Sequence, residues 1–243
     1  MMKLSSFLVC AAFSLTAASL IAQPGLQPVN LGAAAPFAVL GGSGVTNGGG
    51  ATTITGDLGV YPNTLFSGFP PGVVNGSTYI ADQTAMQAEA SLGAAIKYAL
   101  GVKCPARQKI PCVLPKAELG GLTLTPGVYS YSGVATISGK VYLSGDGVYI
   151  FQFAGGLTVL PGGEVVLENG ATQADIFWVT TQATLGSTDD FYGNILSKTS
   201  VTFTATGSTT LYGRALAETL VTFAATDDVT IPVALEKGKK PKK

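Results

Sequence analysis

Short runs of alternating apolar and β-branched residues follow one another along most of the chain. Segments 122–129, 148–153 and 157–160 alternate in this way, and glycine clusters such as 47–50 stand between runs of this kind. Alternation with a period of two residues predicts β-strands, and glycine between the runs predicts tight turns. The pattern therefore predicts a mainly β protein built from many short strands.

One segment has a helical periodicity instead. Between residues 81 and 100, small and apolar side chains recur as a stripe, with Asp82 near its start and Gly101 after it. Spacings of three and four residues predict one long helix, with Asp82 as its N-terminal cap and Gly101 at its end. Because alanine dominates the stripe, we expect the helix to pack closely on a flat surface. The stripe consists of Ala81, Ala85, Ala88, Leu92, Ala95, Ile96 and Ala99.

A repeat near the C-terminus indicates how the strands are arranged. Residues 193–203 align with residues 213–223 at an offset of 20, and residues 178–185 align more loosely with 196–203 at an offset of 18. Self-similarity at this period, in short strands and turns, is typical of a β-solenoid, whose coils stack on one another.

The alternation of side chains along each repeated strand gives the strand two sides. We expect Val201 and Phe203 to point into the solenoid and Thr202 and Thr204 to point out. Stacked coils would then place threonines above one another at the interstrand spacing of about 4.8 Å. The second copy repeats this arrangement with Val221, Phe223 and Thr222.

Composition narrows the possible functions. The chain has 14 Lys plus Arg and 14 Asp plus Glu, and only 12% of its residues are charged. This balance argues against a general nucleic-acid binder, which needs a basic face. The sequence contains no histidine, which excludes Ser–His and Cys–His nucleophile pairs and histidine metal sites. We expect neither a metal site nor a cofactor.

The two ends of the chain differ from the body between them. Lys3 is followed by an apolar run that closes with small residues at Ala22, which predicts a secretory signal peptide over residues 1–22. No later stretch is long and apolar enough for membrane insertion. Residues 237–243 contain five lysines, and a solvated, disordered tail is the favoured interpretation. Residues 23–236 are predicted to form one secreted domain.

Two cysteines remain once the signal peptide is removed. Cys104 and Cys112 lie eight residues apart, and in an oxidising compartment they most simply form a disulfide. The triplet that starts at Asn75 fits a glycosylation acceptor.

The order of several stretches resembles a known family, the secreted ice-binding proteins with a discontinuous right-handed β-helix and an adjoining long α-helix. The resemblance implies a mainly β solenoid of triangular cross-section, with the helix packed alongside and residues 62–80 as a capping region. It also implies a monomer without enzymatic activity, whose partner is the ice crystal surface. The matching stretches are 31–32 with 37–40, 54–62, the alanine-rich helix, 122–129, 176–179, and 191–196 running into 213–217.

Some members of this family carry a motif on the ice-binding face: Thr, then Ala or Gly, any residue, and Thr or Asn. Segments 181–184, 199–202 and 219–222 keep both threonines and depart at the second position, as Gln182, Ser200 and Leu220. The sequence does not show which face of the solenoid carries Thr158, and Thr158 is expected to matter less for ice activity. The predicted ice-binding residues are Thr181, Thr184, Thr199, Thr202, Thr204, Thr219 and Thr222.

Threonine suits an ice-binding array for physical reasons. Its hydroxyl anchors one water, and its methyl leaves neighbouring waters to their own network. Its β-branched rotamer is stiff, which keeps the array ordered. The competing interpretation is that threonine is simply favoured on solvent-facing strands, where columns of it stabilise the ladder. The family resemblance favours ice binding.

A carbohydrate-active β-solenoid is one alternative. It would use paired carboxylates or a bound cation, for which Asp189-Asp190 and Asp227-Asp228 are the candidates. Each pair is expected in a turn, where aspartate bonds its own backbone, and this role is favoured. For Arg214, an ion pair or a carbonyl contact at a coil corner is favoured over assistance to a base.

A secreted adhesin or carbohydrate-binding module is the other alternative. Trp178, the single tryptophan, would be its sugar-stacking platform. Its strand, residues 176–179, is apolar throughout, so a place in the core is favoured.

Overall fold

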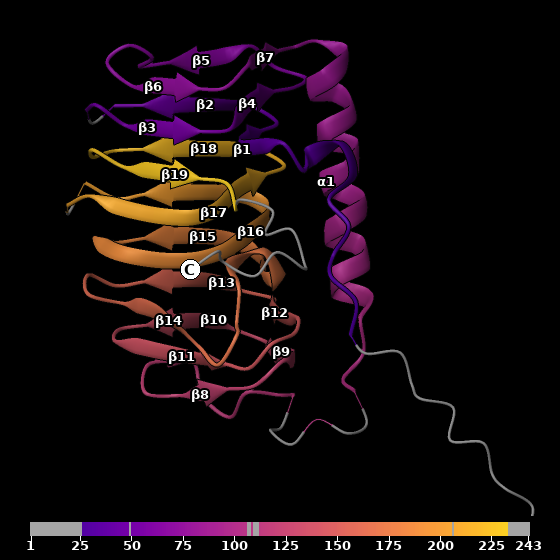
Figure 1. The fold of residues 1–243 in the computed structure, drawn as a ribbon. Helices are drawn as coiled ribbons and strands as arrows, with labels where there is room; N and C mark the ends of the chain where they lie inside the picture. The colour runs from indigo at the N-terminus through magenta and orange to yellow at the C-terminus, as the bar shows by residue number, and fades with distance from the viewer. Residues whose placement is uncertain (1–25, 49, 106–107, 109–111, 206, 233–243) are drawn as a thin grey trace, which may run out of the picture.

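The computed structural model describes residues 26–48, 50–105, 108, 112–205 and 207–232. The predicted signal peptide and the lysine-rich tail lie outside these residues. The described chain forms a stack of short parallel strands with one long helix beside it (Figure 1). The mainly β solenoid with an adjoining helix that the sequence predicts is therefore confirmed.

The elements follow the chain in two groups separated by the helix. The first group is β1 (Phe37–Gly41), β2 (Gly44–Asn47), β3 (Thr53–Thr55), β4 (Asp57–Val60), β5 (Leu65–Ser67), β6 (Val73–Asn75), β7 (Thr78–Ile80) and α1 (Gln83–Gly101). The second is β8 (Thr123–Leu124), β9 (Gly127–Tyr131), β10 (Val134–Ile137), β11 (Lys140–Ser144), β12 (Tyr149–Phe153), β13 (Gly156–Val159), β14 (Glu164–Glu168), β15 (Ile176–Leu185), β16 (Thr188–Phe203), β17 (Thr209–Ala217), β18 (Leu220–Phe223) and β19 (Asp228–Thr230). Short 3₁₀ turns, η1 (Gly32–Ala34) and η2 (Gln173–Asp175), precede β1 and β15.

Each coil of the solenoid contributes strands to three faces, because the chain turns three corners per coil. The helix face is the ladder β9-β12-β15-β16-β17-β1-β4-β7. The threonine face is the ladder β10-β13-β15-β16-β18-β2-β5. The third face consists of β8, β11 and β14, then the first residues of β16 and β17, then β19, β3 and β6.

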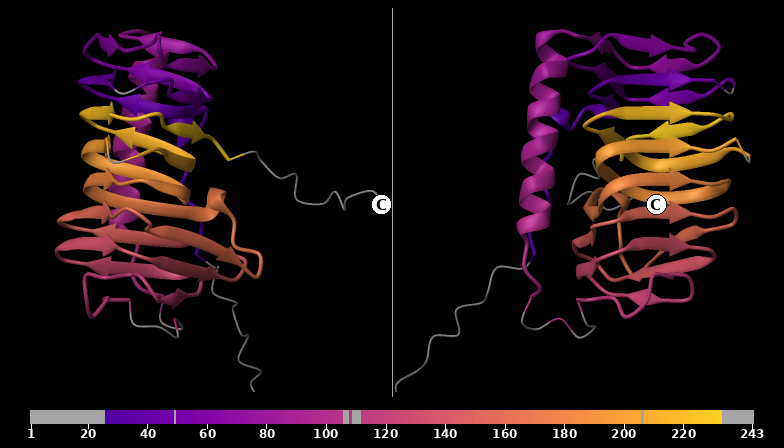
Figure 2. Two further views of the ribbon diagram at one scale, coloured as in Figure 1. Left: turned by 90° about the vertical axis from the view of Figure 1, so that its left-hand side faces the viewer. Right: turned by 180° about the vertical axis from the view of Figure 1, so that it is seen from behind.

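The coils do not stack in chain order. The N-terminal strand β1 pairs with β17 on one side and with β4 on the other, so the first coils extend the C-terminal end of the stack. Helix α1 then runs beside the stack and carries the chain to the opposite end, where β8 begins (Figures 1 and 2). The solenoid is thus discontinuous, as the family resemblance implied.

Aromatic side chains fill the interior between the three faces. Trp178 is fully buried, stacks on Phe151 with ring centroids 4.0 Å apart, and donates a hydrogen bond from Nε1 to the carbonyl of Tyr192 at 2.9 Å. Phe203 and Phe223 stack at 4.6 Å. The inward positions predicted for the repeat are therefore confirmed, and Trp178 is a core residue rather than a sugar platform.

Helix α1 closely matches the predicted one. The Asp82 carboxylate accepts a hydrogen bond from the Ala85 N–H at 2.8 Å, so its capping role is confirmed. Ala81 is wrong as a helix residue: it is exposed and has φ 51°, because the chain turns there before the helix begins. The other six stripe residues are buried, and all of them except Ala85 share one apolar cluster with leucines and valines of the helix face.

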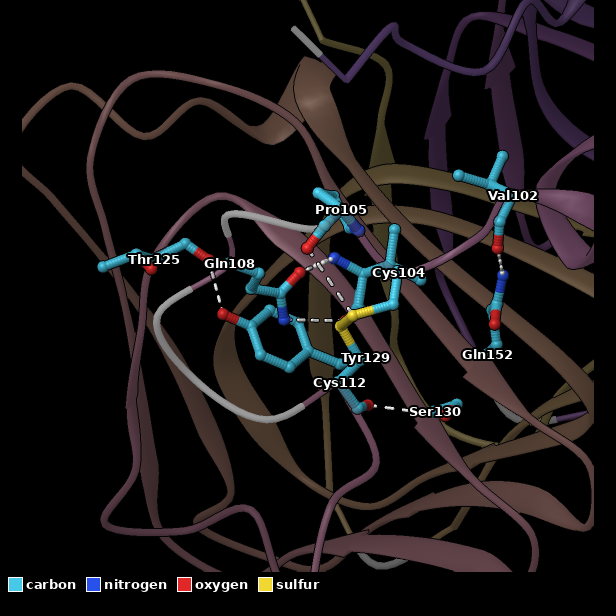
Figure 3. The surroundings of a disulfide bond; sticks show 10 residues. Val102, Cys104, Pro105, Gln108, Cys112, Thr125, Tyr129, Ser130 and Gln152 are labelled. Carbon is cyan, nitrogen blue, oxygen red and sulfur yellow. Dashed lines mark hydrogen bonds between the residues drawn. A yellow bond between two sulfur atoms is a disulfide. The ribbon is translucent and has the colours of Figure 1, made fainter. Parts of the chain in front are cut away.

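The end of the stack at β8–β10 is covered by residues 112–119. Cys104 and Cys112 form the predicted disulfide, with Cα atoms 5.8 Å apart. The Cys112 carbonyl accepts the Ser130 N–H at 2.6 Å, and Gln152 donates to the carbonyls of Ala99 and Val102 at the end of α1 (Figure 3). This contact ties the end of the helix to the coil beneath it.

At the other end, β5, β6 and β7 each pair on one side only among the described strands. Residues 62–80 therefore form the terminal coil, which agrees with the capping position expected for them. Within the described part of the chain, α1 and the 3₁₀ turns are the only helices, and none is long and apolar enough to cross a membrane.

Candidate functional site

Seven hydroxyl-bearing side chains form one column along the threonine face. Direct register pairs join each rung to the next, and every member points away from the core. From the disulfide end to the terminal coil, the threonine column consists of Thr136, Thr158, Thr184, Thr202, Thr222, Thr46 and Ser67.

The column is held by the core directly beneath it. In each strand the residues on both sides of the column residue point inward, and most are fully buried, such as Val201 and Phe203 around Thr202. The threonines are half-buried because neighbouring rungs cover their flanks. Thr46 Oγ1 donates to Thr222 Oγ1 at 3.4 Å, which joins the N-terminal and C-terminal parts of the column.

Two further outward columns flank the threonine column, and neither contains a Lys, Arg, Asp or Glu. The first column, two residues earlier in each strand, is Val134, Gly156, Gln182, Ser200, Leu220, Gly44 and Leu65. The second, two residues later, is Ser138, Leu160, Gly186, Thr204, Ala224 and Gly48. Seven rungs are separated by six interstrand spacings of about 4.8 Å, which makes this uncharged surface about 29 Å long. The outer two columns are four residues apart along each strand, at about 3.3 Å per residue, which makes it about 13 Å wide.

The predicted threonines divide into two groups. Thr184, Thr202 and Thr222 are consecutive rungs of the threonine column, and Thr204 lies in the column beside it. Thr181, Thr199 and Thr219 stand instead at the corner between the helix face and the threonine face.

The corner threonines make backbone contacts. Thr181 Oγ1 donates to the Ala154 carbonyl at 2.7 Å, and Thr199 Oγ1 donates to the Thr181 carbonyl at 2.6 Å. The Thr219 carbonyl accepts the Ser43 N–H at 2.5 Å. The hydroxyls of Thr181 and Thr199 therefore hold successive coils together at the corner.

Sequence reasoning missed Thr46 and Thr136 and left the face of Thr158 unassigned. The structure places Thr158 in the threonine column, between Thr136 and Thr184, so the expectation that it matters less has no structural basis. Thr136 and Thr158 share a signal with Thr202 and Thr222: each stands between two apolar residues, as in Val-Thr-Phe and Leu-Thr-Val. Thr46 lacks this signal, because Asn47 follows it. The separations of 22, 26, 18 and 20 residues from Thr136 to Thr222 hide this triplet from a search at one fixed offset.

Asp227 and Asp228, one of the carboxylate pairs of the carbohydrate-active alternative, do not form a catalytic pair. Asp227 is fully buried and Asp228 is exposed, so the two side chains point apart. Asp227 Oδ1 accepts the Thr209 N–H at 3.0 Å, and burial raises the pKa of the carboxyl to about 6. Within the described residues, Asp227 Oδ2 has no hydrogen-bond partner.

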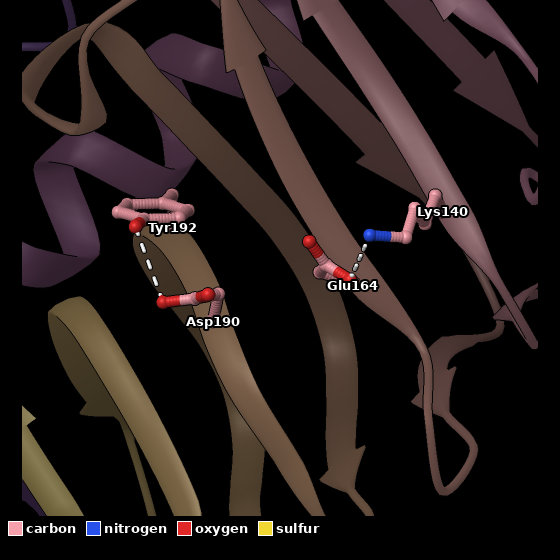
Figure 4. Close-up of polar contacts among 4 residues, drawn as sticks. All are labelled: Lys140, Glu164, Asp190 and Tyr192. Atoms are coloured by element: carbon pink, nitrogen blue, oxygen red, sulfur yellow. Dashed lines mark hydrogen bonds and ion pairs between the residues drawn. The ribbon is translucent and has the colours of Figure 1, made fainter.

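Asp190 lies within strand β16 rather than in a turn, which corrects the expectation for this pair. It accepts a hydrogen bond from the Tyr192 hydroxyl at 3.2 Å, and nearby Glu164 is paired with Lys140 at 2.8 Å (Figure 4). Burial and the Asp190 charge raise the pKa of Tyr192 to about 12. Nothing in the described residues brings three His, Cys, Asp or Glu side chains together as metal ligands.

Arg214 is a structural residue. Nε and Nη2 donate to the Ala35 carbonyl at 2.9 and 2.6 Å, and Nη1 donates to Asn194 Oδ1 at 2.7 Å. Burial lowers the pKa of its guanidinium to about 10. The favoured role as a carbonyl partner is confirmed. Asn75 is exposed at the end of β6, and its glycosylation stays a prediction.

A discontinuous β-solenoid with one long helix along a face is the fold of solved ice-binding proteins, a non-enzymatic class. The chain belongs to the ice-binding-like family, whose model matches residues 39–229.

Relatives and solved structures agree with this assignment. An ice-binding protein of Nostoc sp. is 38% identical over 183 residues, which cover 72% of this chain and 64% of that protein's own length. The crystal structure of an ice-binding protein from the Antarctic ascomycete Antarctomyces psychrotrophicus is 32% identical, with a TM-score of 0.78, and the match covers 86% of this chain and 100% of that one. A crystal structure from an Antarctic biological consortium is 37% identical, with a TM-score of 0.79 and coverage of 87% and 94%.

Proposed function

We propose that this protein adsorbs to ice through the threonine face and thereby inhibits ice growth and recrystallisation. The observation that carries the proposal is the seven-rung threonine column in the middle of an uncharged surface. Membership of the ice-binding-like family supports it.

Ice offers a binder neither charge nor a pocket, so adsorption depends on how the protein arranges water. Each threonine presents a hydroxyl that fixes a water and a methyl that leaves adjacent water to its own network. The column repeats this pair at every coil, at about 4.8 Å. Because the core beneath holds the side chains still, little conformational freedom is left to lose on binding.

The proposed contact residues follow from this geometry. Thr184, Thr202, Thr204 and Thr222 keep the role that the sequence suggested. Thr46, Thr136 and Thr158 join them, since they share the column. Thr181, Thr199 and Thr219 are assigned to the edge of the face.

We also propose that the protein acts outside the cell as a monomer. The Cys104–Cys112 disulfide supports an oxidising compartment. The predicted signal peptide points the same way.

Tyrosine substitutions on two faces test the proposal. Thr202→Tyr and Thr158→Tyr each place a ring in the threonine column, where it would hold the array away from the crystal. Thr230→Tyr is the matched control, because Thr230 points outward on the third face, beside Tyr212. Strand positions tolerate tyrosine, so all three variants should fold.

The measurements are thermal hysteresis, ice-crystal shaping and the melting temperature of the protein. We expect both column variants to lose ice activity at an unchanged melting temperature, and the control to keep it. Full activity in the column variants would place the binding surface elsewhere, and an inactive wild-type protein would refute the function itself.

A further inference from the structure

Gln182 is the longest side chain on the threonine face. It is exposed in the first column, opposite Gly156 on one side and Ser200 on the other. The other residues of that column are glycine, serine, valine or leucine. Among the described residues, its side-chain amide makes no hydrogen bond.

The stem of Gln182 lies over the neighbouring glycine. A Cβ atom at Gly156 would stand 3.3 Å from Gln182 Cγ and 3.8 Å from Val134 Cγ2. The side chains of both adjacent rungs therefore fill the space above Gly156.

The same arrangement occurs once more in the first column. A Cβ atom at Gly44 would stand 2.8 Å from Leu65 Cγ, so Leu65 lies over Gly44 as Gln182 lies over Gly156. In both places a longer side chain covers a glycine and levels the surface. The two differ in their ends, which are methyl groups in leucine and an amide in glutamine.

That difference matters at a surface that must order water. The amide of Gln182 can donate two hydrogen bonds and accept two more, and it rotates freely at the end of a flexible stem. It binds water in many orientations, in contrast to the threonines, whose rotamers are fixed. Such an amide would disturb an ordered water layer beside Thr184.

We propose that the Gln182 amide limits the affinity of the threonine face for ice, while the Gln182 stem keeps the first column level. This inference rests on the proposed function. It makes Gln182 an affinity-determining residue that acts against the array rather than as part of it.

Two substitutions separate the stem from the amide. Gln182→Leu keeps a stem over Gly156 and reproduces the arrangement of Leu65 over Gly44. Gln182→Met keeps an unbranched stem of similar length. We expect both to raise thermal hysteresis several-fold at equal protein concentration, with an unchanged melting temperature.

Ser200→Gln is the converse variant, because it adds a second amide on the adjacent rung, and it should lower thermal hysteresis. Gln182→Ala should gain less than Gln182→Leu, since it uncovers Gly156. Unchanged or reduced activity in both the Leu and the Met variants would overturn the proposal. If Thr202→Tyr loses the wild-type activity and neither Gln182 variant gains activity, this inference alone fails. If Thr202→Tyr is fully active, the proposed binding face fails and this inference fails with it.

Discussion

A buried carboxyl between helix α1 and the solenoid should make the stability of the fold depend on pH. Glu89 projects from α1 beside the buried Ala88, and its Oε1 is buried with no hydrogen-bond partner among the described residues. Glu218, at the corner between β17 and β18, faces the same stretch: its Oε1 lies 3.3 Å from the Cβ position at Gly93. Burial first, and then the Glu218 charge, raise the pKa of Glu89 to about 8.

The sign and size of the effect follow from this raised pKa. The folded state binds the proton more tightly than the unfolded chain, whose Glu89 titrates at 4.5. The stability that Glu89 contributes is therefore fully present below pH 4.5 and is lost as the pH rises through about 8. Proton linkage gives a loss of about 1 kcal/mol between pH 7 and pH 9.5, which is a fall of about 2–4 °C in melting temperature.

Glu89→Gln removes the titrating group and keeps its shape. We expect the variant to be more stable than the wild-type protein at pH 9.5 and to lose the slope between pH 7 and 9.5, as measured by thermal melting. Glu118→Gln is the control. Hydrogen bonds from the Ser138 and Gly120 N–H groups lower the pKa of Glu118, so this residue changes the stability of the fold only at acid pH. Parallel melting curves for the wild type and Glu89→Gln over this range would refute the reasoning.

Two further predictions concern single polar contacts. Asp227→Asn should raise the melting temperature at pH 7. The pKa of Asp227 is raised to about 6, so the stability that its protonated carboxyl contributes is fully present below pH 3.8 and is lost as the pH rises through 6. Asparagine keeps the acceptor for the Thr209 N–H, so an equal or lower melting temperature at pH 7 would count against this account. Thr199→Val removes the hydrogen bond to the Thr181 carbonyl and should cost about 1 kcal/mol with thermal hysteresis retained. Loss of ice activity in a folded Thr199→Val protein would instead place the corner hydroxyl in the binding surface.

The sequence predicted the elements whose pattern is local. Helix α1 was predictable because its alanine stripe has helical spacing and Asp82 provides a cap. The inward and outward sides of β16 and β18 followed from alternation within one repeat. The error at Ala81 arose because a residue with the right spacing lies in the turn before the cap, where φ is positive.

The full extent of the threonine column was not predictable, for two physical reasons. Coil length varies because loops are inserted at the corners, so equivalent threonines recur at unequal separations. In addition, neighbours in space are far apart in the chain, as with Thr222 and Thr46, 176 residues away. The corner role of Thr181 and Thr199 depends on carbonyls of the preceding coil, and a motif within one strand does not contain that information.

The discontinuous stacking also dictates when the fold can be completed during synthesis. Strands β1 to β3 need β17 to β19 as neighbours, and these are made last. The coil of β1 to β3 must therefore leave the ribosome with only β4 to β6 as neighbours and wait for most of the chain before its other neighbours are made. Contacts of such long sequence separation make folding slow and leave strand edges open meanwhile. Pairing of β2 with β18, which brings Thr46 beside Thr222, is thus a late step in folding. It joins the N-terminal and C-terminal parts of the threonine column into one continuous surface.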